Sequence, residues 1–201
     1  MGYDIGDRYV KISQNPRSSK IKKLQDFFNR CLYVFAKDVS EHELLRVLEE
    51  IKRHKSDFVR CYPDPLYFLV KCAKKKGIGG VSLKGINTTG NILFPEARTL
   101  IEDFFECRIT DSFSCEGGAN VTQCSTGQCY HSTMEYAYTE VVDEQGNEVK
   151  PGQRGRLVTT CLWNYATPFI RYDTQDIVVK SEKECNCGRK LLPITQIEGR
   201  D

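Results

Sequence analysis

The sequence of 201 residues lacks any apolar run of about 18 residues, the minimum for a transmembrane helix. Its first 11 residues also lack the apolar stretch of a secretory signal peptide. We therefore expect a cytoplasmic protein with no membrane partner. Internal repeats and low-complexity tracts are missing as well, and 40% apolar with 28% charged residues is typical of a globular chain. This length predicts one domain, or one and a half.

A large net charge is absent too, because the formal net charge is only +2. Residues 1–85 nevertheless hold 18 basic and 10 acidic side chains, and residues 86–201 hold 11 basic and 17 acidic ones. A basic half can bind nucleic acid or a phosphorylated ligand, but it is more often a solvated helix face. No nucleic-acid-binding module is recognisable, so we expect no nucleic-acid partner. A nucleic-acid-binding zinc protein is the third hypothesis, after the two given at the end of this subsection.

The order of the sequence patterns predicts an α/β protein. Helical spacing of apolar residues predicts helices at 18–30, from Ser40 onward, at 63–76 and at 95–106. Ser40 and Glu43 have the spacing of a capping box. Strands are expected at 32–36, 81–86, 108–112, 136–142, 155–160, 170–172, 177–179 and 191–197. The alternation of helical and strand patterns predicts a parallel α/β region first, and β-type patterns dominate after about residue 110.

Cysteine is abundant, with ten residues. Without a signal peptide, we expect reduced thiols, some of them buried and some bound to a metal. Cys124, Cys129 and His131 lie within eight residues, and Cys185 and Cys187 follow about 54 residues later. Two short clusters of soft ligands are typical of a tetrahedral zinc site. The alternative is that several of these cysteines are ordinary buried residues.

Polar residues also gather where strands are expected to end, at 88–91, 113–118 and 171–176. Loops that follow parallel strands are common ligand sites in α/β proteins. Hydroxyls and backbone amides can hold phosphate there, and acidic side chains can hold Mg²⁺ or ribose hydroxyls. The three segments are therefore candidates for a nucleotide site.

Several motifs, in order along the chain, resemble one enzyme family. Residues 166–176 (ATPFIRYDTQD), 185–189 (CNCGR) and 197–201 (IEGRD) are similar to conserved segments of the phenylacetate–coenzyme A ligase branch of adenylate-forming enzymes. Upstream, residues 88–91 (TTGN) resemble its Thr-Gly-Glu turn, and residues 111–118 resemble its Tyr-Gly-x-Thr-Glu motif. The resemblance covers most of the chain and extends to CapK-like members linked to capsular polysaccharide biosynthesis.

The resemblance implies a ligase that uses ATP to convert a small-molecule carboxylate into an acyl-adenylate, which coenzyme A can then accept as a thioester. Asp176 would bind the ribose hydroxyls of ATP or AMP, and Arg200 would approach the ribose or phosphate. Glu116 would coordinate Mg²⁺ with ATP. Thr89, Gly90 and Asn91 would border the adenine.

The same resemblance implies two further sets of residues. Phe113 would take the place of the family's adenine-stacking aromatic residue, and Cys115 that of its phosphate-binding threonine. Cys124, His131, Cys185 and Cys187 match the structural zinc ligands of several members, a set that leaves out Cys129. The chain departs from the family where Gln175 replaces the glycine of Thr-Gly-Asp and where Asn91 replaces the glutamate of Thr-Gly-Glu.

The resemblance also assigns the chain to the second half of the family's large N-terminal domain, ending at the hinge to a C-terminal domain. Residues 1–115 would form an α/β subdomain, and residues 116–201 a β-rich, partly barrel-like subdomain. The family's Ser/Gly/Thr-rich phosphate loop would precede residue 1, and its catalytic lysine would follow residue 201. We therefore expect the remaining parts of the enzyme to be partners, and the 201 residues alone not to catalyse adenylation efficiently. The alternative hypothesis is a zinc-stabilised nucleotide-binding or interaction module without catalysis.

Overall fold

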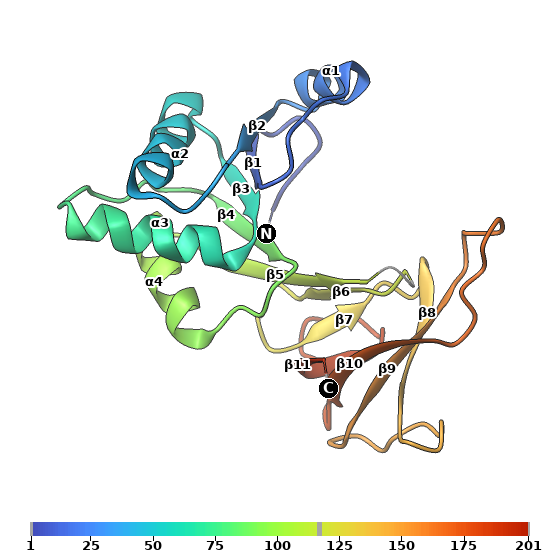
Figure 1. Ribbon diagram of the computed structural model, residues 1–201. Helices are drawn as coiled ribbons and strands as arrows, with labels where there is room; N and C mark the ends of the chain where they lie inside the picture. The colour runs from blue at the N-terminus through green and yellow to red at the C-terminus, as the bar shows by residue number, and fades with distance from the viewer. Residues whose placement is uncertain (1, 116–117, 201) are drawn as a thin grey trace. The chain divides into compact units, whose positions relative to one another are not determined.

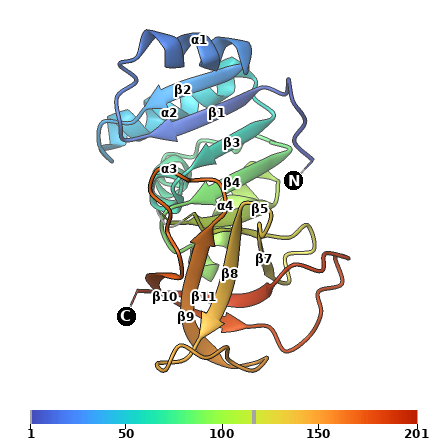
Figure 2. The same cartoon turned by 90° about the vertical axis from the view of Figure 1, so that its right-hand side faces the viewer.

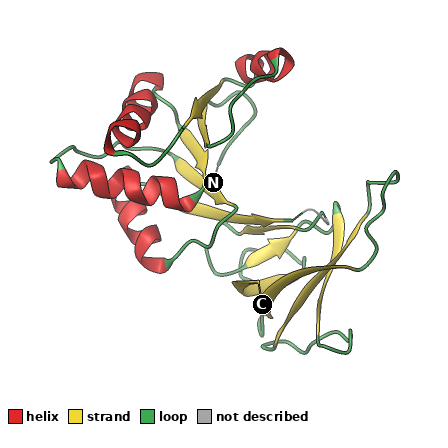
Figure 3. Cartoon of the chain, viewed as in Figure 1, coloured by secondary structure: helices red, strands yellow, loops and turns green. Residues whose placement is uncertain are grey.

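The computed structural model describes residues 2–115 and 118–200, which form two compact units, Met1–Ile109 and Thr110–Asp201. Figure 1 colours them along the chain. Figure 3 shows that the helices belong to the first unit and that the second consists of strands and loops. The predicted α/β class is confirmed.

The first unit alternates strands and helices around a parallel sheet. Its elements are β1 (Tyr9–Ser13), α1 (Lys20–Phe28), β2 (Cys31–Phe35), α2 (Glu41–His54), β3 (Phe58–Cys61), α3 (Pro63–Lys75), β4 (Gly85–Thr89) and α4 (Pro95–Phe105). The strand order is β2-β1-β3-β4, and these neighbours pair in parallel. Figure 2 shows the four strands side by side.

The reversal of direction after β2 decides which face of this sheet each helix covers. The chain steps one way from β1 to β2 and the other way from β2 to β3 and β4. Right-handed crossovers then place α1 on one face and α2 and α3 on the other. In Figure 1, α1 accordingly lies across the strands from α2 and α3. The core forms on the face of α2 and α3, with Leu48, Leu66 and Ile86 fully buried.

Helix α1 shows an unexpected surface. The apolar residues that predict this helix, Ile21, Leu24, Phe27 and Phe28, are 58–76% exposed. Asp26 is buried instead, because Arg17 holds its carboxylate with two hydrogen bonds of 2.6 and 2.8 Å. Periodicity therefore located the helix correctly, although its apolar residues do not enter the core of this unit.

The second unit is an antiparallel sheet. It comprises β5 (Ile109–Ser114), which begins one residue earlier, β6 (Asn120–Gln123), β7 (Tyr130–Ser132), β8 (Ala137–Val142), β9 (Arg154–Cys161), β10 (Tyr172–Lys180) and β11 (Pro193–Arg200). The strand order is β5-β6-β7-β11-β10-β9-β8. Val121, Val141, Leu157, Val178 and Ile194 form its core. The antiparallel pattern predicted for this half of the chain is present.

Several local expectations need correction. The strand expected at 81–86 begins only at Gly85, and the two strands expected at 170–172 and 177–179 are the single strand β10 with an irregular register. Ser40 is the N-cap of α2, but its side chain makes no capping hydrogen bond. The Glu43 carboxylate accepts from the Lys37 backbone N–H and the Arg46 guanidinium instead, so the predicted capping box does not form.

No helix in the part of the chain that the structure describes combines the length and the apolar composition of a membrane-spanning segment.

The contrast between α1 and α2 can be tested by unfolding. We expect Leu48→Ala to lower the free energy of unfolding by about 2–5 kcal/mol, because the Leu48 side chain is fully buried and its loss leaves a cavity. Phe27→Ala should change it by less than about 0.5 kcal/mol, because Phe27 is 76% exposed. Urea titrations followed by circular dichroism would measure both; similar losses would contradict the described packing of α1.

Candidate functional site

The turn after β4 is fixed by close packing in the first unit. Gly90 follows Thr89 with φ +91, and a Cβ atom there would lie 2.1 Å from the Tyr62 ring. Only glycine satisfies both conditions. Asn91 continues the turn, and its side-chain amide donates a hydrogen bond to the Asp64 carboxylate at the start of α3. Thr89, Gly90 and Asn91 are thus held at the carboxyl end of a parallel strand, a common place for a ligand site.

Asp176 and Arg200 are neighbours in the second unit. They are register partners on β10 and β11, and Arg200 Nε lies 3.9 Å from Asp176 Oδ1. The Asp176 side chain is buried, with the residue only 4% exposed. Its Oδ2 atom has no hydrogen-bond partner among the described residues. Burial raises the pKa of this carboxyl above its ordinary value, and a hydrogen bond from Thr174 and the charge of Arg200 oppose that rise.

A buried oxygen without a partner is costly, so it points to a missing donor. Hydroxyl groups of a ligand would supply such donors to Asp176 Oδ2. Arg200 adds a positive charge on the neighbouring strand.

Gln175 precedes Asp176 with φ 62, in the left-handed region that favours glycine. The motif that the sequence resembles has glycine at this position, and glycine adopts this conformation without strain. The Gln175 backbone N–H donates to Asp173 Oδ1 at 2.9 Å, which helps to hold this irregular stretch of β10.

The other nucleotide candidates lie around β5. Phe113 is on this strand and Cys115 follows it, and both are half-buried against the core of the second unit. The Cys115 backbone pairs with the Ala119 carbonyl at 3.1 Å. Glu116, the candidate magnesium ligand, lies outside the described residues.

Three of the four residues expected to bind zinc, Cys124, His131 and Cys185, come together in the second unit, and Cys129 rather than Cys187 completes the group. The ligand atoms of Cys124, Cys129, His131 and Cys185 all lie within 4.8 Å of one another, and all four residues are buried. Cys124 Sγ is 3.5 Å from Cys185 Sγ. Zn–S bonds of about 2.3 Å in a tetrahedron place sulphurs about 3.8 Å apart, so this spacing suits zinc.

Local structure orients the histidine of this cluster. His131 lies on β7, and its Nδ1 is 3.2 Å from the Leu191 carbonyl oxygen. A proton on Nδ1 would donate to that oxygen and leave Nε2 available as a metal ligand. Cys187 Sγ lies 3.3 Å from Nε2. Cys187 is therefore adjacent to the cluster, and both Cys129 and Cys187 are within reach of an ion beside His131.

The thiols of the cluster also influence each other's charge. A hydrogen bond from the Cys129 thiol is the main reason that the pKa of Cys185 is lowered, and His131 and Cys124 contribute to it. Burial raises the pKa of Cys129. A thiolate at Cys185 among three potential co-ligands is the chemistry that binds a soft or borderline cation.

Sequence reasoning missed one group of side chains. A cavity in the first unit is lined by Lys11 on β1, by Arg60 on β3 and by Arg17 in the loop between β1 and α1. Neither β1 nor β3 was expected as a strand. The alternation of apolar and polar residues in YVKIS at 9–13 was the available signal, but five residues are few for recognising a strand.

No protein-family model matches the chain. Over 71 residues it is 37% identical to phenylacetate–coenzyme A ligase from Thermus thermophilus, a match that covers 35% of this chain and 16% of that enzyme. The predicted resemblance to this branch of adenylate-forming enzymes is confirmed.

Solved structures show the same fold. A 2-hydroxyisobutyryl-CoA ligase in complex with 2-HIB-AMP and CoA aligns with a TM-score of 0.79 at 22% identity, covering all of this chain and 46% of that one. A long-chain-fatty-acid-CoA ligase from Archaeoglobus fulgidus aligns with a TM-score of 0.67 at 13% identity, covering 99% of this chain and 44% of that one. The chain thus spans less than half the length of these proteins.

The burial of Asp176 predicts a pH dependence of stability. The pKa of Asp176 is raised in the folded chain, so folding opposes its ionisation. The stability that the protonated group contributes is therefore lost as the pH rises from about 4 through the raised pKa. Asp176→Asn cannot ionise, so we expect its stability relative to the wild type to improve over that pH range. Urea unfolding of both proteins between pH 4 and pH 8 would measure the difference; a relative loss as the pH rises would contradict it.

Proposed function

We propose that this chain is part of an adenylate-forming ligase that uses ATP to activate a carboxylate as an acyl-adenylate, which coenzyme A then accepts. The observation that carries the proposal is Asp176, whose buried Oδ2 has no partner among the described residues and which lies beside Arg200. The match over 71 residues to a phenylacetate–coenzyme A ligase supports the reaction class. The CoA and 2-HIB-AMP named for a neighbouring structure support the nucleotide and the acceptor.

In this proposal each site residue has a defined task. Asp176 accepts hydrogen bonds from the ribose hydroxyls, and Arg200 places a positive charge near the ribose or the α-phosphate. The backbone at Thr89, Gly90 and Asn91 borders the adenine, with Phe113 as the stacking residue and Cys115 near phosphate. Glu116 would hold Mg²⁺ with ATP.

AMP binding tests the nucleotide assignment without requiring turnover. We expect the chain to bind AMP and Asp176→Asn to weaken binding at least about tenfold, because hydrogen bonds to a charged group are worth about 1.5–3 kcal/mol. Asp103→Asn is the matched control, since Asp103 is exposed on α4. Isothermal titration calorimetry would measure all three affinities. Unaltered binding by Asp176→Asn would contradict the role of Asp176, and no binding by the wild type would favour an interaction module.

We also propose that the cysteine cluster holds one structural zinc ion. The donor set fits this ion, because three thiols and an imidazole lie within 4.8 Å and Cys187 is next to His131. Four protein ligands would leave no open position for water, so the ion would stabilise the fold rather than take part in the reaction. It would join the β6–β7 hairpin to the loop before β11.

Zinc removal should therefore destabilise the chain. Structural zinc contributes about 10–16 kcal/mol in small domains, so we expect a chelator to lower the melting temperature clearly and Cys185→Ser to lose the ion. Cys72→Ser, on α3 of the first unit, is the matched control. Metal analysis of Cys129→Ser and Cys187→Ser would identify the fourth ligand. Zinc retained by Cys185→Ser, or a melting curve unchanged by chelation, would contradict the proposal.

A further inference from the structure

One face of the parallel sheet in the first unit carries a row of polar side chains. Parallel pairing sets Lys11 on β1 opposite Tyr33 on β2 and opposite Arg60 on β3. These residues alternate along their strands with Val10, Ile12 and Val59, which belong to the core. The row therefore lies on the face opposite the core, which α2 and α3 leave uncovered.

Two side chains of this row, Lys11 and Arg60, are cations. Lys11 and Arg60 are neighbours in register, and like charges side by side on a sheet destabilise it. Within residues 2–115 and 118–200, no salt bridge joins Lys11 or Arg60 to an acidic side chain. Burial and the charges of Arg60 and Arg17 lower the pKa of Lys11. Asp26 neutralises Arg17 and opposes the lowering of the Lys11 pKa, so the positive charge density of this row comes from Lys11 and Arg60.

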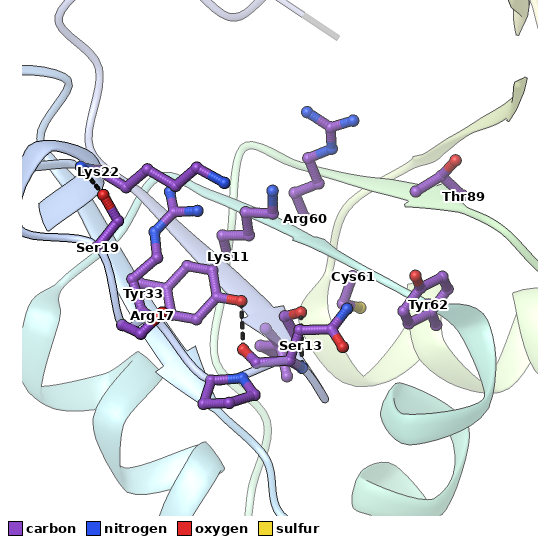
Figure 4. Close-up of a pocket in the computed structure, with 14 residues that line it drawn as sticks. Lys11, Ser13, Arg17, Ser19, Lys22, Tyr33, Arg60, Cys61, Tyr62 and Thr89 are labelled. Carbon is purple, nitrogen blue, oxygen red and sulfur yellow. Dashed lines mark hydrogen bonds between the residues drawn. The ribbon is translucent and has the colours of Figure 1, made fainter. Parts of the chain in front are cut away.

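These cations line a cavity of about 360 Å³. Lys11, Arg17, Lys22 and Arg60 contribute four basic side chains to its wall, and none of the lining residues is acidic. Figure 4 shows the charged ends of Lys11, Lys22 and Arg60 on the same side of the pocket. This volume lies within the range of small-molecule sites.

Hydrogen-bonding groups complete the wall. Ser13 and Ser19 bring hydroxyls to the cavity, whereas the Tyr33 hydroxyl already donates to the Asn15 carbonyl oxygen at 2.6 Å. Arg17 is already held, because it binds Asp26 and lies 4.4 Å above the Tyr33 ring, so its position is fixed before any ligand arrives. A wall of cations and hydroxyls with a fixed guanidinium is suited to oxyanions.

We propose that this pocket binds an oxyanion, a phosphate or carboxylate group of a small molecule, and that the ligase's acid substrate carries this group in addition to the carboxylate that is activated. The second part rests on the proposed function. It is favoured by Thr89, which lines the pocket and also begins the turn proposed to border the adenine. The first part depends only on the pocket itself.

Binding of inorganic phosphate, pyrophosphate and citrate to the complete 201-residue chain tests the pocket. We compare the wild type with the double variant Lys11→Met/Arg60→Met at constant ionic strength, by calorimetry and by the shift in melting temperature. The control double variant Lys74→Met/Arg108→Met removes the same charge from exposed positions outside the pocket. Circular dichroism verifies folding, and the single variants Lys11→Gln and Arg60→Gln replace the double variant if it does not fold.

We expect the wild type and the control to bind at least one of these anions more tightly than chloride, and the pocket variant to lose at least about tenfold in affinity. Equal binding by all three proteins, an equal loss in the control, or no binding by the wild type would overturn the pocket. AMP affinity is measured in parallel. AMP binding that the pocket variant retains supports a separate substrate group, whereas a matching loss of AMP binding would assign the pocket to nucleotide phosphate and overturn the substrate assignment.

AMP binding also separates the two proposals. If AMP does not bind but phosphate does, the proposed ligase function fails and the anion pocket stands. If AMP binds through Asp176 and no anion binds the cavity, the anion pocket fails and the ligase proposal stands.

Discussion

The change of direction after β2 is the constraint on which the first unit depends. Because crossovers between parallel strands are right-handed, this single reversal places α1 on one face of the sheet and α2 and α3 on the other. The core forms only on the second face, where Leu48, Leu66 and Ile86 are buried. The first face, on which α1 lies, carries polar residues such as Lys11 and Arg60. The cation-lined cavity is a consequence of that arrangement.

A second constraint acts in the other unit, where antiparallel pairing sets the end of β11 beside the middle of β10. Residues far apart in the sequence, Asp176 and Arg200, become register partners in this way. The buried carboxylate keeps one oxygen without a partner among the described residues. The Asp176 backbone N–H is paired, because it donates to Thr174 Oγ1. The same folding brings Cys185 to the hairpin that carries Cys124 and His131. Both candidate centres thus use long-range pairing rather than a single contiguous motif.

The sequence predicted the helices well because their signals are local. Proline at the first turn and helical spacing located α3 and α4 within one or two residues. Strands β1 and β3 were not predicted because each is short and carries a cation. The order of the strands explains why Lys11 and Arg60 are tolerated there, because it places them on the face opposite the core. The exposed apolar side of α1 was equally unpredictable, since periodicity reveals an apolar face but not what covers it.

The candidate site residues also divide into those that the sequence predicts and those that it does not. Motif resemblance selected Asp176 and Arg200, and the structure brings them together. The choice between Cys129 and Cys187 depends on turn geometry, which residue spacing does not determine.

The most direct measurement of the central claim is a crystal structure of the chain with bound AMP. We predict ribose hydroxyls within hydrogen-bond distance of Asp176 Oδ2; AMP bound elsewhere, with that oxygen still unpartnered, would contradict the account.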